Sequence, residues 1–216
     1  MRNRGPIIVG VFSLLLGAVE PGRGQQVVDR IAARVESDVI LLSEVQELSR
    51  YQFLVDGKSE SDSVLLDRLL DQWIVRNEAR ISLFPEPSER DVERSLQRLK
   101  RTFSSEEEFR ERQRQSGLTD RDLLRILKLQ LYLSNYLDTR FRPSIQVADQ
   151  DVEEYYRSRV VPRAESGGQT PPTLEASREF IQEALVLRAI NDQADRWLKE
   201  SRSRLRVDKL LDGGSE

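Results

Sequence analysis

Residues 27–45 read VVDRIAARVESDVILLSEV, and their pattern of apolar and polar residues predicts the first structural elements of the chain. Apolar and polar residues alternate in part from Val28 to Val35, as expected for a half-buried strand. Glu36-Ser37-Asp38 then supplies turn-forming residues, and Val39 to Leu42 provides a return strand. The stretch therefore predicts a small β-hairpin.

A helix is expected to follow the hairpin directly. Ser43-Glu44-Val45-Gln46 matches a capping box, in which the Ser43 hydroxyl accepts a hydrogen bond from a first-turn amide and the Gln46 side chain reaches back. The predicted helix runs from Ser43 to about Val55 and stops at Asp56-Gly57.

The segment before the hairpin has the order of a secretory signal peptide. Arg2 and Arg4 give a positive start, and residues 7–16 form an apolar stretch that is too short to span a bilayer. Small residues before Gln25 offer a cleavage site, with cleavage after Ala18 as an alternative. We therefore expect residues 1–24 to be a signal peptide and residues 25–216 to be an exported domain without an integral membrane segment.

Composition favours a helical protein with a solvated surface. Charged residues make up 33% and hydrophobic residues 38%, and both signs of charge are interspersed along the chain. The formal net charge of -3 gives no reason to expect nucleic-acid binding.

The absence of histidine and cysteine restricts the chemistry of the chain. General acid–base catalysis near neutral pH usually uses histidine, and zinc sites nearly always use histidine or cysteine. Carboxylate-only chemistry, as in glycosidases or magnesium sites, needs carboxylates held in a cleft, whereas the acidic residues here fall at helix starts or on charged helical faces. We therefore expect no enzyme activity, no metal and no cofactor.

Apolar residues three and four positions apart predict a series of further helices. Prolines, glycines and capping residues delimit them. The expected ranges are 62–82, 88–102, 104–117, 119–142 and a helix from Asp149 that contains Val152, Tyr155 and Tyr156. The helix that starts at Thr119 is apolar around more than half its circumference, which indicates either burial between other helices or a face left for a partner.

The clearest internal boundary is predicted at residues 161–173, where Pro162, Gly167, Gly168, Pro171 and Pro172 mark a flexible linker. It separates residues 25–160 from residues 174–216. Beyond it, a long helix from Leu174 to about Ser201 is expected, followed by a strand at 205–210. A lone strand needs an edge on which to pair, and the N-terminal hairpin offers one.

Taken in order, these segments resemble the N-terminal chaperone module of periplasmic chaperones of the SurA type. The resemblance rests on the hairpin and on short motifs spread over nearly the whole mature chain. These motifs are Ser43-Glu44-Val45, residues 69–75 (LLDQWIV), residues 88–92 (SERDV), Gly117-Leu118-Thr119 and residues 147–156 (VADQDVEEYY).

The resemblance implies a mainly α fold, an irregular multi-helix chaperone module with a small β-sheet formed by the N-terminal hairpin and a C-terminal strand. It also implies ATP-independent holding of unfolded exported or outer-membrane polypeptides in the periplasm. In such proteins one or two parvulin prolyl isomerase domains usually follow the helix that ends in Tyr-Tyr. Here the predicted linker stands in that place, and a chain without histidine cannot supply the parvulin active-site histidines.

A holdase needs an apolar or aromatic surface with adaptable contacts. Aromatic residues near helix ends or on the broad helix are the candidate peptide-binding residues, namely Tyr51, Phe53, Phe103, Tyr132 and Tyr136. The alternative for each is an ordinary place in the core, because aromatic residues at helical spacing usually face inward.

Two other functions stay open, a prolyl isomerase and an envelope adaptor that binds one fixed partner. A homodimer in which two copies exchange hairpins and terminal strands also stays open.

Overall fold

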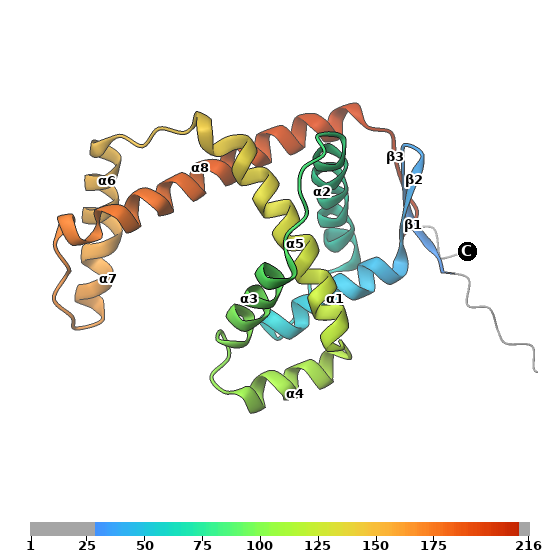
Figure 1. The fold of residues 1–216 in the computed structure, drawn as a ribbon, viewed down its shortest axis with the longest axis horizontal. Coiled ribbons are helices and arrows are strands. Elements are labelled where there is room, and N and C mark those ends of the chain that lie inside the picture. The colour runs from blue at the N-terminus through green and yellow to red at the C-terminus, as the bar shows by residue number, and fades with distance from the viewer. Residues whose placement is uncertain (1–28, 212–216) are drawn as a thin grey trace, which may run out of the picture.

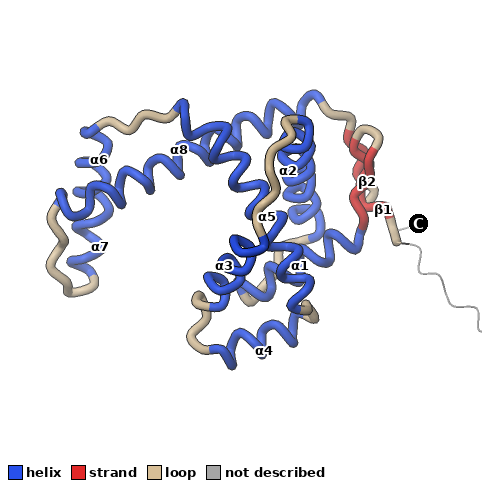
Figure 2. Tube along the Cα trace, in the orientation of Figure 1, coloured by secondary structure: helices blue, strands red, loops and turns tan. Residues whose placement is uncertain are grey.

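The computed structural model describes residues 29–211, and the predicted signal peptide and strand residues 27–28 lie outside this range. The described chain is mainly helical, with one small antiparallel sheet, as the sequence predicted (Figures 1 and 2). In chain order the elements are β1 (Ile31–Val35), β2 (Asp38–Leu41), α1 (Leu42–Asp56), α2 (Asp62–Ile81), α3 (Glu89–Lys100), α4 (Glu106–Ser116), α5 (Asp120–Phe141), the 3-10 turn η1 (Arg142–Ser144), α6 (Asp149–Tyr155), the π-helical turn η2 (Tyr156–Val160), α7 (Val161–Ser166), α8 (Leu174–Arg204) and β3 (Val207–Lys209).

The sheet joins the two ends of the described chain. Its strand order is β2-β1-β3, and both pairings are antiparallel. Val35 lies opposite Asp38 on one side and Val207 on the other. The prediction that the terminal strand pairs with the hairpin is therefore confirmed, and β1 becomes the central strand.

The predicted Ser43 cap is wrong. Helix α1 begins one residue earlier, with Leu41 as its N-cap, and the Glu44 carboxylate accepts the Leu41 amide at 2.8 Å. The Ser43 hydroxyl instead donates to Asp29. Strand β2 ends at Leu41 and helix α1 starts at Leu42, so Ser43 lies inside the first turn of the helix and cannot be its N-cap.

Several other helix ends follow the sequence signals, but the expected cap at Asp149 is wrong, because Ala148 is the N-cap of α6 and Asp149 is the first residue of the helix. Ser88, Ser105 and Thr119 each accept a first-turn amide of α3, α4 and α5, respectively. Gly57 and Gly117 end α1 and α4 with φ of 73° and 69°, a left-handed conformation that favours glycine.

The core consists of three clusters of buried side chains. One lies between the sheet, α1 and α2, where the Trp73 indole donates to Asp38 at 2.9 Å. A second joins α1, α3, α4 and α5, and a third joins α2, α5 and the C-terminal half of α8. Because α5 contacts α2, α3 and α8, most of its broad apolar surface packs against other helices, although Leu124 is 38% exposed.

A polar cluster ties the C-terminal elements to α2. Arg202 near the end of α8 donates to Asp71 at 2.7 Å and to both the carboxylate and the backbone carbonyl of Asp67. Lys209 of β3 reaches the Asp67 carboxylate at 2.8 Å. Burial raises the pKa of Asp71, and the hydrogen bond from Arg202 opposes that shift.

Helix α8 extends well beyond the rest of the structure and carries a separate group of helices at its N-terminal end (Figure 1). We call residues 145–189, which comprise α6, η2, α7 and the first half of α8, the arm, and the remainder the body. Residues 161–166 of the predicted linker form α7, so the connection without helix or strand is confined to residues 167–173. Among the described helices none has a stretch both long and apolar enough to cross a membrane.

Candidate functional site

The five aromatic residues singled out from the sequence do not gather at one surface. Tyr51 and Phe103 pack against the cluster of α1, α3, α4 and α5, and Tyr132 and Tyr136 belong to the cluster around α2 and α5. Phe53 is half-buried in α1 and lies outside all three clusters.

Their polar and ring contacts are internal. The Tyr51 hydroxyl donates to Gln130 at 3.1 Å, and burial raises the pKa of that hydroxyl. Phe103 packs edge-on against Phe109 with 5.3 Å between ring centroids, and Phe84 packs against both Tyr132 and Tyr136. These contacts place Tyr51, Phe103, Tyr132 and Tyr136 within the packing of the body.

The arm contains a groove that these residues do not form. The helix that starts at Asp149 continues past Tyr155 because its backbone widens into the π-helical turn η2 before Pro162. A proline within a helix lacks an amide donor and its ring crowds the carbonyl four residues earlier, here that of Ser158. The wider turn accommodates the ring, and α7 proceeds from it.

The turn between α7 and α8 is built by specific local contacts. Gly168 has φ of 67°, and the amides of Gly168 and Gln169 donate back to Glu165 and Ala164, which is the Schellman pattern of a helix end. The Tyr156 hydroxyl donates to the Pro172 carbonyl at 2.8 Å. Thr173 then accepts the Ala176 amide and caps α8.

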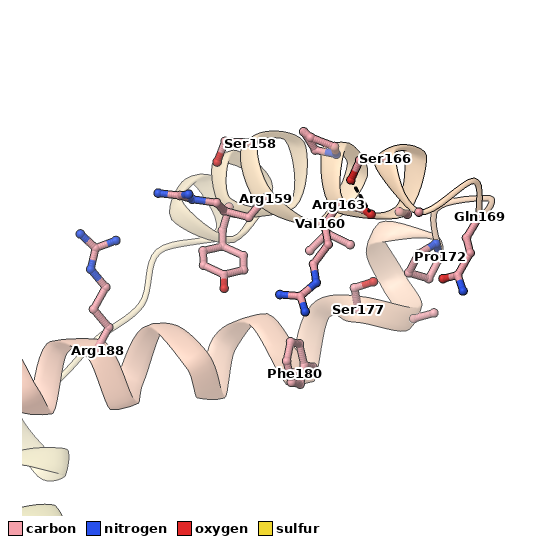
Figure 3. Close-up of a pocket in the computed structure, with 15 residues that line it drawn as sticks. Ser158, Arg159, Val160, Arg163, Ser166, Gln169, Pro172, Ser177, Phe180 and Arg188 are labelled. Carbon is pink, nitrogen blue, oxygen red and sulfur yellow. Dashed lines mark hydrogen bonds between the residues drawn. The ribbon is translucent and has the colours of Figure 1, made fainter. Parts of the chain in front are cut away.

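Helix α6 packs on α8, and its residues anchor the arm. Val152 of α6 and Ile181 of α8 are both fully buried, and Arg178 pairs with Asp149 at 2.6 Å. Past the π-helical turn, α7 and α8 are separated by a groove of about 1440 Å³ (Figure 3). We call it the arm groove. Its lining residues are Tyr155, Ser158, Arg159, Val160, Pro162, Arg163, Ala164, Ser166, Gly167, Gln169, Pro172, Ala176, Ser177, Phe180 and Arg188.

The arm groove combines apolar and cationic side chains. Phe180 of α8 is 72% exposed although its neighbour Ile181 is fully buried. In Figure 3, Arg163 points from α7 toward α8 and Arg188 rises from α8 toward the opposite helices. The lining includes three arginines and no carboxylate.

A smaller pocket of about 430 Å³ adjoins the arm groove on the side of α6. Arg159 and Arg188 border both spaces, whereas the carboxylates of Asp151, Glu154 and Asp192 line only the smaller one. The arm groove is therefore bordered by positive charge alone, and the carboxylates border only the smaller pocket beside α6.

No group of side chains suited to holding a metal ion occurs within residues 29–211. No protein-family model matches the chain, and no curated protein matches it. The resemblance to SurA-type chaperones therefore stays a prediction made from the order of its motifs.

The long helix from Leu174 was predicted from the sequence, but the exposure of Phe180 and the arm groove were not. The buried side of α8 follows Ser177, Ile181, Ile190 and Ala194, and Phe180 lies beside that line. A usable signal was the pair Arg159 and Arg163, two like charges four residues apart in a helical segment with no acidic residue between them.

Proposed function

We propose that this protein is an ATP-independent holdase chaperone that binds unfolded exported or outer-membrane polypeptides in the periplasm. The observation that carries the proposal is the arm groove with the exposed ring of Phe180. An open groove lined by aromatic, aliphatic and polar groups suits reversible contact with extended, partly apolar segments.

The energetics fit weak, reversible binding. Covering an exposed phenylalanine side chain contributes about 1–2 kcal/mol at the fraction exposed here, and neighbouring Val160 and Pro172 add apolar area. Ordering an unfolded segment costs free energy that opposes this gain. Stable holding of one client therefore requires several such weak contacts along its chain. A receptor for one ligand, in contrast, binds through a single site.

The placement of the arm groove also supports the proposal. The elements that line it, η2, α7 and the first half of α8, lie away from the sheet (Figure 1). The arm connects to the body through α8 and the segment after α5, so a client at the arm would leave the packed body undisturbed. The resemblance of the motif order to SurA-type chaperones points to the same class of function.

The test is suppression of aggregation of a denatured outer-membrane barrel on dilution. The purified protein should suppress light scattering at near-stoichiometric ratio, and Phe180→Ser should reduce suppression severalfold. Ile81→Ser is a matched control, because Ile81 is 68% exposed on α2 in the body, and it should behave like the wild type. No suppression by the wild type at tenfold excess would exclude the holdase, and equal suppression by Phe180→Ser would exclude the arm groove as its binding site.

Two assays separate the alternatives. A prolyl isomerase would accelerate a proline-limited refolding reaction, and we expect no acceleration. An adaptor would recover one stoichiometric partner from an envelope extract, whereas a holdase should recover many unfolded polypeptides.

A further inference from the structure

The arm groove has a charge pattern that restricts what can occupy it. Within the described residues, no carboxylate lies within 4.0 Å of the guanidinium groups of Arg159, Arg163 or Arg188. All three side chains are exposed. Elsewhere in the structure arginines commonly pair with a carboxylate one turn away, as Arg110 does with Glu106 and Arg157 does with Glu153.

Keeping these arginines together is unfavourable for an empty groove. Like charges one helical turn apart destabilise a helix by about 0.2–0.5 kcal/mol. No acidic side chain lines the groove itself, because Asp151 and Glu154 of the arm and Asp192 of the body line only the adjoining pocket. An anionic occupant would remove the repulsion and gain charge-assisted hydrogen bonds.

The exposed ring of Phe180 further restricts the kind of ligand that fits the arm groove. It lies on the same wall as Arg188, one helix across from Arg163 (Figure 3). A small inorganic anion would leave this ring exposed. A peptide with both carboxylates and apolar side chains could pair with the arginines and also cover the Phe180 ring. Guanidinium groups beside an aromatic ring can also stack on aromatic side chains of a ligand.

We infer that the arm groove selects unfolded segments that combine acidic and aromatic residues, and that the acidic residues bind toward α7. This inference rests on the proposed holdase function and names the client class of the same site. It distinguishes the groove from a purely apolar surface, which would bind neutral and acidic segments alike.

The experiment measures binding of three unstructured, fluorescently labelled 12-residue peptides to the full chain. Each has one phenylalanine and one tyrosine, and they differ only in carrying four glutamates, four glutamines or four lysines. In about 50 mM salt we expect the acidic peptide to bind about tenfold more tightly than the neutral one and the basic peptide to bind most weakly. The three arginines of the groove attract the glutamates of the first peptide and repel the lysines of the last. At about 0.5 M salt the difference should fall below about threefold.

Matched variants locate the effect. Arg159→Gln, Arg163→Gln and Arg188→Gln combined should abolish the preference, and the same three changes to lysine should retain most of it. Arg94→Gln, Arg110→Gln and Arg114→Gln remove the same charge from exposed ion pairs on α3 and α4 and should leave the preference intact. Circular dichroism establishes that each variant is folded.

The outcomes separate this inference from the proposed function. Equal binding of the three peptides, with aggregation suppression that still depends on Phe180, would overturn the inference and leave the holdase standing. A preference lost equally in the α3 and α4 control would also overturn it, since net charge and not the groove would then be responsible. Failure of every peptide to bind, together with no aggregation suppression, would overturn both.

Discussion

The arm should unfold independently of the body when its small core is weakened. Between Asp149 and Ile181 the buried apolar side chains are Val152 and Ile181, both fully buried, whereas the body has three clusters. Truncating a buried isoleucine to alanine costs about 2–5 kcal/mol. With so few other contacts to hold the arm, Ile181→Ala should remove most of its local stability.

Hydrogen exchange measured by mass spectrometry is the assay, because it reports opening of each segment separately. A loss of about 2–4 kcal/mol corresponds to exchange about 30- to 1000-fold faster for the amides of α6 and α7, up to the limit of full exposure. The amides of α2 from Leu65 to Trp73 should keep their wild-type rates. Val152→Ala, on the opposite helix, should give the same pattern with a smaller increase.

Two results would refute this reasoning. If the α2 amides accelerate by the same factor as those of α7, the arm and body unfold as one cooperative unit. If neither segment accelerates, Ile181 contributes little to the arm, and the packing of α6 on α8 does not hold the groove in place.

Three further changes test other parts of the structure. Leu83 has φ of 54° and is 89% exposed at the C-terminal end of α2, where the Phe84 amide donates back to the Ala79 carbonyl. Leu83→Gly should therefore stabilise the protein by about 0.5–1 kcal/mol and raise the thermal midpoint by about 1–4 °C, and a lower midpoint would contradict the strain. Hydrogen bonds with Thr119 lower the pKa of the Asp122 carboxylate, so this group stabilises the fold above its unfolded pKa, and that stability is lost as the pH falls through the lower folded pKa. Asp122→Asn should therefore make the urea midpoint fall less steeply below about pH 4 than it does in the wild type. Arg202→Gln should destabilise the protein by about 1–2 kcal/mol and raise the pKa of Asp71 further, as followed by NMR titration; an unchanged Asp71 would mean that Arg202 does not stabilise its charged form.

Much of the fold could be predicted because its signals are local. Ser88 and Thr119 are capping residues placed directly before apolar periodicity, and Gly57 and Gly117 occupy left-handed positions that end helices. Pairing of the terminal strand was predictable for a different reason, namely that a lone strand requires an edge.

The errors arose where distant residues or backbone adjustments decide the outcome. Ser43 donates to Asp29, fourteen residues away, and Glu44 takes over the capping role at Leu41. Pro162 was interpreted as the start of a linker, but the π-helical turn before it allows the helix to continue.

The candidate site was harder to predict than the fold because burial is not a local property. Tyr51 and Tyr136 have the same aromatic character as Phe180, but they pack in the body while Phe180 stays exposed. The side of α8 that is buried depends on the packing of α6, α5 and α2 against it, which are contacts between elements far apart in the sequence.

Photocrosslinking at position 180 tests the central claim most directly. A photoreactive phenylalanine analogue placed at Phe180 should crosslink to an unfolded outer-membrane barrel, and the same analogue at Leu83, an even more exposed apolar position on the body, should not. Crosslinking at position 180 alone is the predicted result. Crosslinking at position 83 with none at 180 would contradict the arm groove as the client-binding site.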